Sequence, residues 1–210
     1  MTTTKTQTAS AAKRVSGTRN APRARRSNFV STDGMLTVDD LAALPDTKPR
    51  YELINGILIQ KMTTKRKHSV AAGRLLFQLM LWAQENPDWQ FFPEGTGVKV
   101  SEYKAYVPDV VGFAPGSVLD PEESIGGAPF LVAEVLSKST AKRDRVDKLR
   151  DYASLGVQLY LIVDPDKKKM EVHTLENGNY SAPRVLETDD VWQPEELKGL
   201  KLEVQKLWFA

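Results

Sequence analysis

Apolar residues along the chain follow two spacings, which predict a mixture of strands and helices. Short apolar runs that suit strands occupy residues 89–92, 98–100, 106–113, 130–136 and 157–163. The dipeptides Asn55-Gly56 and Asn177-Gly178 each separate two further runs. Because Asn-Gly favours a tight two-residue turn, both are predicted to form β-hairpins.

Three segments have the pattern of helices. The first begins with Thr37 as N-cap and ends at Pro45. The second, residues 68–85, is apolar on most faces, so we expect it to be largely buried. The third, residues 144–155, is followed by Gly156, which suits a helix C-cap.

The order of these elements indicates the fold class. Strand 130–136, helix 144–155 and strand 157–163 form a βαβ-like unit, with hairpins before and after it. This succession predicts an α/β fold with a single mixed β-sheet flanked by helices. The C-terminal segment KLEVQKLWFA is apolar enough to dock on the core.

Composition excludes several classes of protein. A chain of 210 residues with 41% apolar and 27% charged residues suits one globular domain. It has no apolar stretch of transmembrane length and no apolar signal-peptide core. The absence of cysteine removes disulfides and thiolate sites and fits a cytoplasmic location. With two histidines, a multi-histidine zinc site is not expected.

The first 30 residues carry seven bases and no acid, which leaves the remaining residues with a net charge of −5. We therefore expect a disordered basic tail at residues 1–34 and a folded domain at residues 35–210. The tail suits three roles: a solvated extension, a non-specific nucleic-acid arm or an organelle transit peptide. The folded part is mildly acidic, so any nucleic-acid binding must rest on local basic patches.

Two carboxylates interrupt predicted buried strands. Glu134 lies in the run PFLVAEVL, and Asp109 follows Pro108 in YVPDVVGF. A buried carboxylate loses hydration at a cost of several kcal/mol unless it is paired or bound to a cation. Two such groups on neighbouring strands therefore suggest a divalent-metal site, and oxygen ligands favour Mg²⁺ or Mn²⁺.

Basic residues close to Glu134 favour a phosphate substrate. Six bases and two acids lie between Lys138 and Arg150, just beyond the end of the strand. A second basic group, residues 65–68, opens the helix at His68. Ligands of α/β sheets tend to bind at such strand ends.

The ordered series YELINGIL, VPDVVGF, AEVLSKST and DRVDKLRDYASLGVQLYLIVDP resembles the Uma-two-type restriction endonuclease family of the PD-(D/E)XK superfamily. The resemblance covers about residues 36–208. It implies a restriction-endonuclease-like fold and an Mg²⁺-dependent endonuclease acting on DNA. It also implies metal binding by Asp109, Glu134 and the backbone carbonyl of Val135.

One position departs from the superfamily pattern. The lysine expected two residues after the acid is Leu136 here, and Lys148 in the following helix matches an alternative source of that lysine. Helical spacing places Asp144, Lys148 and Tyr152 on one stripe, so Lys148 could reach the strand ends. The resemblance gives Lys148 the role of orienting or deprotonating water, and it gives Glu52 that of an accessory acid.

Each of these residues also has a structural interpretation. Glu134 could pair with an arginine, Asp109 could simply start a strand, and Lys148 could form a surface pair with Asp144. Glu52 could be an exposed hairpin acid, and His68 is more readily a helix-start residue than a base. Tyr152 and Tyr160 suit packing at the edge of the core.

Two other functions remain open at this stage. The first is a nuclease-fold protein that binds nucleic acid or a partner protein without cleaving, which Leu136 keeps in play. The second is a different magnesium-dependent hydrolase of phosphate esters. A homodimer would suit double-strand cutting, although no stretch of the sequence shows where it would form.

Overall fold

The computed structural model describes residues 34–44, 50–61, 64–123 and 125–209. The predicted basic tail, residues 1–34, lies outside the described residues except for Gly34, and so does Pro45. In the described part of the chain, no helix is long and apolar enough to cross a lipid bilayer.

The largest sheet has seven strands. In spatial order these are β11 (Asn179–Tyr180), β10 (Lys169–Glu176), β9 (Leu159–Asp164), β8 (Leu131–Val135), β6 (Val110–Phe113) and β3 (Gln90–Pro93), with β12 (Arg184–Leu186) also paired to β10. Strands β8 and β9 are parallel, as the predicted βαβ unit requires, and the other pairs are antiparallel.

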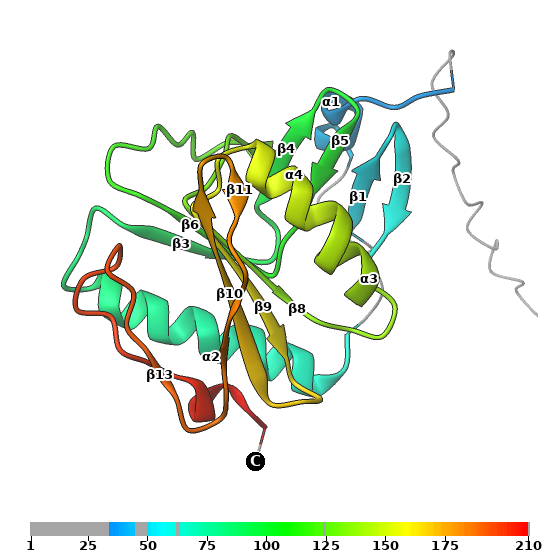
Figure 1. The fold of residues 1–210 in the computed structure, drawn as a ribbon. Coiled ribbons are helices and arrows are strands. Elements are labelled where there is room, and N and C mark those ends of the chain that lie inside the picture. Colours follow the sequence, from blue (N-terminus) through cyan, green and yellow to red (C-terminus); the bar gives the residue numbers. More distant parts are fainter. Residues whose placement is uncertain (1–33, 45–49, 62–63, 124, 210) are drawn as a thin grey trace, which may run out of the picture.

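Helices cover both faces of this sheet (Figure 1). Helix α2 (Arg66–Ala83) packs on one face, and the other is covered by a continuous helical segment. That segment consists of α3 (Ala141–Arg143), the π-helical turn η1 (Asp144–Lys148) and α4 (Leu149–Ser154). Side chains of a strand alternate between faces, so Leu131, Ala133 and Val135 of β8 join the core under α2. The same alternation turns Glu134 toward the face under η1 and α4.

The remaining strands form a second, five-stranded sheet and a small two-stranded one. The five strands, in spatial order, are β2 (Ile57–Gln60), β1 (Tyr51–Ile54), β5 (Lys104–Tyr106), β4 (Gly97–Ser101) and β7 (Ile125–Gly126). The fold class is the predicted α/β class, with its strands divided between sheets instead of gathered in one.

The division occurs where the sequence predicts one continuous strand, residues 106–113. Strand β5 ends at Tyr106 and β6 begins at Val110, and the chain passes from one sheet to the other between them. Pro108 has no backbone N–H and therefore cannot extend a ladder there. The N–H of Asp109 donates to the carbonyl of Ala133 at 3.2 Å, which fixes the chain beside β8.

The two predicted hairpin turns and the predicted helix cap at Thr37 are confirmed. Asn55 and Gly56 both have positive φ, as do Asn177 and Gly178, which is the signature of type I′ hairpin turns. Thr37 caps the short helix α1 (Val38–Ala42) and forms a capping box with Asp40.

Helix α2 is less buried than predicted. Leu75 and Leu79 are buried against the sheet, but Phe77, Met80 and Leu81 are 65%, 51% and 53% exposed. The expectation that this helix is largely buried is therefore wrong. The sheet covers one stripe of α2, and the described residues leave the outward apolar side chains uncovered.

The C-terminal segment docks on the core beside α2, as predicted. It contains β14 (Leu202–Glu203), which pairs with β13 (Val191–Trp192), and the 3₁₀ turn η2 (Val204–Leu207). Leu202, Val204 and Leu207 are fully buried.

Candidate active site

A cleft of about 380 Å³ opens where β6 begins and β8 ends. Residues from distant parts of the chain line it: β1, the end of β2, the first turn of α2, β8 and the loop after it, and η1. Its charged and titratable lining residues are Glu52, Lys61, Lys65, Lys67, His68, Asp109, Glu134, Lys138, Arg143, Lys148 and Asp166. The four side chains predicted to be functional, Glu52, Asp109, Glu134 and Lys148, all lie in this cleft.

Asp109 is held in place from three sides. Its Oδ2 accepts a hydrogen bond from the backbone N–H of Val135 at 2.7 Å and lies 3.2 Å from Nε2 of His68. Its Oδ1 lies 3.5 Å from Nζ of Lys61. Burial alone would raise the pKa of Asp109, but His68, Lys61 and the Val135 N–H outweigh burial and lower that pKa to about 2. The Asp109 carboxylate is therefore ionised at neutral pH.

Glu134 is buried, and its polar contacts among the described residues fall on one oxygen. Oε1 accepts hydrogen bonds from Nζ of Lys148 at 2.7 Å and from the Tyr152 hydroxyl at 3.1 Å. Burial and the negative charges of Asp144 and Asp109 raise the pKa of Glu134 to about 8, although Lys148 opposes this rise. Burial, more than the neighbouring acids, therefore favours the protonated form of Glu134 in the absence of a bound cation.

Lys148 joins three acids in the interior. Besides Glu134, its ammonium group lies 2.9 Å from Glu52 Oε1 and 3.5 Å from Asp144 Oδ1. It also lies 5.1 Å from the centre of the Tyr106 ring, within range of a cation–π contact. Burial would lower the pKa of Lys148, but the three carboxylates outweigh burial and raise it. Lys148 is therefore a fixed positive charge.

The helix that carries Lys148 differs locally from the expected α-helix. Residues 144–148 form a π-helical turn, a rare feature that occurs frequently at functional sites. The predicted stripe survives this change, because Asp144, Lys148 and Tyr152 all lie at the carboxylate cluster. The interpretation of Lys148 as half of a surface pair is wrong, since its side chain is 2% exposed.

Glu52 is fully buried, which excludes its interpretation as an exposed hairpin acid. Its Oε2 lies 2.9 Å from Nη2 of Arg143, and its Oε1 contacts Lys148. Burial would raise the pKa of Glu52, but Lys148 and Arg143 outweigh burial and lower it. Glu52 thus ties the first hairpin to η1.

The structure adds Lys61, which no pattern in the sequence indicated. Its Nζ donates to the Val107 carbonyl at 2.6 Å and pairs with Glu94 at 3.0 Å, in addition to its contact with Asp109. Lys61 stands at the end of β2, and the pairing of β1 with the distant β5 brings this strand to the cleft. A local pattern carries no signal of that pairing.

Two other residues have contacts that their sequence interpretation did not include. His68 lies in the first turn of α2 and also contacts Asp109. Tyr152, expected to pack at the edge of the core, donates its hydroxyl to Glu134. Its place on the Lys148 stripe was the signal that could have identified it.

The donor set fits a hard divalent cation. Four acids of the cluster are buried, namely Glu52, Asp109, Glu134 and Asp144, and three bases face them, namely Lys61, Arg143 and Lys148. Within the described residues, both oxygens of Asp144 are buried without a hydrogen-bond donor. The described residues contain no group of three acids or histidines arranged as a complete metal site. A cation here would thus rely on one or two carboxylates plus water, as Mg²⁺ usually does.

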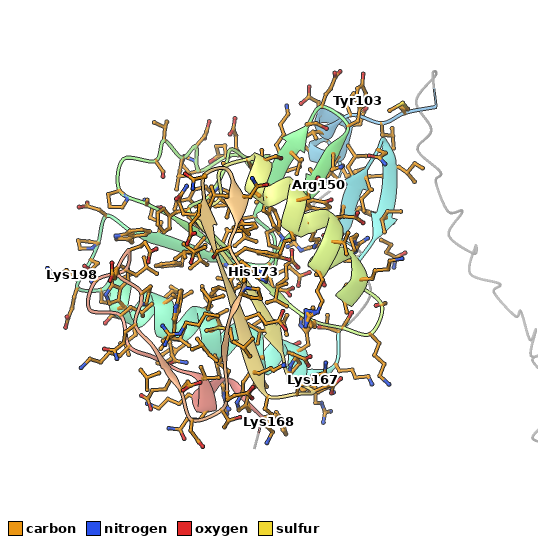
Figure 2. The ribbon with its side chains drawn as sticks, viewed as in Figure 1. Tyr103, Arg150, Lys167, Lys168, His173 and Lys198 are labelled. Atoms are coloured by element: carbon orange, nitrogen blue, oxygen red, sulfur yellow. The ribbon has the colours of Figure 1, made fainter. Side chains whose placement is uncertain are left out.

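The basic residues near Glu134 point in two directions. Lys65, Lys138 and Arg143 line the cleft. Arg150 extends from α4 and pairs with its neighbour Asp151, and Arg145 pairs with Glu171 on β10 (Figure 2 labels Arg150). The local excess of bases predicted from the sequence is therefore divided between the cleft, the contact with β10 and the exposed side of the helix.

Comparisons with known proteins give a family and a fold. The model of the Uma2 family, described as "Putative restriction endonuclease", matches residues 38–205, which is most of the chain. A crystal structure of "a putative nuclease belonging to DUF820" from Anabaena variabilis superposes with a TM-score of 0.69 at 22% identity. The match covers 82% of this chain and 97% of that chain, and it shows a shared fold. A search of the curated proteins found no match.

Proposed function

Since this chain belongs to the Uma2 family, we propose that it is a metal-dependent endonuclease that hydrolyses phosphodiester bonds in DNA. Nuclease function in general follows from the family and the fold. The metal, the DNA substrate and the roles of individual residues are our proposal. One observation carries it: Asp109, directly before β6, and Glu134, on the adjacent β8, face one cleft together with Lys148.

Asp109 and Glu134 would hold Mg²⁺ or Mn²⁺, with the carbonyl of Val135 as a further ligand. Such an ion lowers the pKa of a bound water and neutralises charge that develops on phosphate. Asp109 is suited to this role because it is ionised at neutral pH and its orientation is fixed by His68 and Val135. Glu134 is suited to it because its Oε2 makes no hydrogen bond within the described residues.

Lys148 would stabilise negative charge on the phosphate and orient Glu134 and the attacking water. Its raised pKa argues against accepting a proton from that water. The role of Lys148 expected from the sequence included deprotonation of the water, and the role proposed here leaves that step out. Glu52 and Asp144 would position the Lys148 ammonium, and Tyr152 would fix the Glu134 carboxyl from the other side.

The entrance of the cleft suits a polyanion. Lys65 and Lys138 are exposed at its rim, and Arg143 is partly exposed beside Glu52. Lysine and arginine side chains placed in this way bind phosphates without reading sequence. We propose that the substrate is DNA and that the protein acts in the cytoplasm. The residues at the rim would contact the DNA backbone.

A second candidate is a nuclease-fold protein that binds DNA or a partner protein without cleaving. Leu136, at the position where the superfamily has lysine, supports it. The position of Lys148 beside Glu134 favours cleavage, because it supplies the missing positive charge from the helix.

Cleavage of supercoiled plasmid by the purified full-length protein tests the proposal. We expect nicking with Mg²⁺ or Mn²⁺, none with EDTA, and loss of at least about a hundredfold in rate for Asp109→Asn and Glu134→Gln. An exposed acid outside the cleft, Glu122, provides the matched control Glu122→Gln, which should cleave like the wild type. Metal-independent cleavage, or cleavage unaffected by both cleft substitutions, would overturn the assignment.

A further inference from the structure

Helix α2 carries a second apolar stripe on its outward side. Val70, Gly73, Phe77 and Met80 follow one another at alternating intervals of three and four residues, with Leu81 adjacent. This is the spacing at which helices pack side by side. Phe77, Met80 and Leu81 are all more than half exposed. Three large apolar side chains together on one helix face indicate an interaction surface.

A hollow of about 390 Å³ lies beside this stripe. It is lined by Ser69, Val70, Gly73 and Arg74 of α2 and by Phe209 of the C-terminal segment. A Cβ atom added at Gly73 would meet nothing within 4 Å, so the floor of the hollow is open. The Arg74 side chain donates to the carbonyl of Trp208, which fixes the far wall. The surface therefore has a protruding Phe77 one turn away from a hollow over Gly73.

We propose that this face binds a second copy of the chain, with the two α2 helices antiparallel about a twofold axis near Leu75. This arrangement places Phe77 of each protomer opposite Gly73 of the other, so that each aromatic ring enters the partner's hollow. It also places Val70 opposite Met80. One face supplies both the protrusion and the hollow, and such self-complementarity is what a twofold interface requires.

The charges at the two ends of α2 favour the same arrangement. Arg66 is exposed at the N-terminal end of α2, and Glu85 is exposed just after its C-terminal end. Antiparallel pairing brings Arg66 of one protomer close to Glu85 of the other, whereas parallel pairing places like charges together. In Figure 2, Lys167 lies near the N-terminal end of α2 and Lys198 lies near its C-terminal end.

The dimer leaves the candidate active site open. The cleft is reached at the first turn of α2, on the side of His68, whereas Phe77 and Met80 point outward from the sheet. The two clefts would lie at opposite ends of the helix pair. The proposed interface rests on the outward face of α2 alone and does not depend on the endonuclease activity.

The mass of the full-length protein in solution, measured by sedimentation equilibrium over a range of concentrations, tests this proposal. We expect a dimer of twice 23.4 kDa for the wild type and a monomer for Phe77→Asp that keeps the far-UV circular dichroism spectrum of the wild type. Gly73→Leu, which fills the hollow, should also give a monomer. Val118 is 99% exposed and lies outside this face, so Val118→Asp should remain dimeric.

A charge exchange tests the antiparallel arrangement itself. Arg66→Glu and Glu85→Lys should each weaken dimerisation about fivefold, because twofold symmetry repeats each change, and the double variant should restore it. A wild type that remains a 23.4 kDa monomer at the highest concentration would overturn the proposal and leave the face to a different partner. A dimer that survives both Phe77→Asp and Gly73→Leu would also overturn it.

Discussion

Lys148 is the residue on which the buried charge of the site converges. Its ammonium group contacts Glu134, Glu52 and Asp144 with its side chain 2% exposed. Such a cluster is stable only while the charges offset one another, because each ion has lost its hydration. The lysine is thus a structural requirement of the site as well as a candidate catalytic group.

Replacing Lys148 with Met removes the cation shared by Glu52 and Asp144 and the hydrogen bond that Lys148 donates to Glu134. We expect the free energy of unfolding at pH 7 to fall by about 3–5 kcal/mol, as urea denaturation in EDTA would measure. Lys142 is exposed on the same helical segment, so Lys142→Met serves as the control. A loss below about 1 kcal/mol for Lys148→Met would contradict the proposed charge balance.

Asp109 predicts a dependence of stability on pH. Its pKa is lowered from 3.8 to about 2 in the folded protein, so the ionised form is stabilised by folding. The contribution, about 2 kcal/mol, is fully present above about pH 5 and is lost as the pH falls toward 2. The difference in unfolding free energy between the wild type and Asp109→Asn, measured without metal, should shrink over that range. A difference that stays constant from pH 6 to pH 2.5 would exclude this role of Asp109.

At the scale of elements, the segment from α3 to α4 determines whether the cluster forms. The π-helical turn η1 buries both Asp144 and Lys148. Gly156, with a φ of +81°, ends the whole helical segment. Periodicity predicted the helix and the stripe that faces Glu134, because i and i+4 neighbours share a face in either helical form. It could not predict the π-helical turn, whose cause lies in the packing on the sheet.

A substitution at Gly156 tests what fixes the C-terminal end of the segment from α3 to α4. Alanine at Gly156 would have to adopt a left-handed conformation, and we expect a loss of about 1 kcal/mol in unfolding free energy. Gly127 does not have a positive φ, and a Cβ there would meet nothing within 4 Å, so Gly127→Ala should change stability little. Equal effects of the two substitutions would show that the helix end is not fixed by Gly156.

Features that depend on neighbouring residues could be predicted from the sequence, whereas features that depend on distant parts of the chain could not. The Asn-Gly hairpins and the Thr37 cap depend on neighbouring residues, so their patterns were sufficient. The exposure of one side of α2 and the change of sheet after Tyr106 depend on distant parts of the chain. In the site, Asp109 and Glu134 were predictable because carboxylates in apolar strands need compensation, whereas Lys61 enters through non-local strand pairing.

For the molecule as a whole, the proposed DNA contacts predict a salt dependence. Binding of a short duplex by the Glu134→Gln variant should weaken as salt rises, because bound phosphates release counterions. Adding Lys65→Gln or Lys138→Gln should each reduce the slope of log K against log salt by about one. Lys201 is exposed away from the cleft, and Lys201→Gln should leave the slope unchanged. Slopes unaffected by the rim substitutions would place DNA elsewhere on the surface.

The account depends most on a divalent cation at Asp109 and Glu134. Because the pKa of Glu134 is about 8, metal binding at pH 7 must displace its proton. Titration calorimetry with Mn²⁺ in buffers of different ionisation enthalpy should therefore show one site and the release of about one proton. Binding should disappear in Asp109→Asn and Glu134→Gln and persist in Glu122→Gln. A wild type that binds no Mn²⁺ or Mg²⁺, or one whose binding survives both cleft substitutions, would contradict the account.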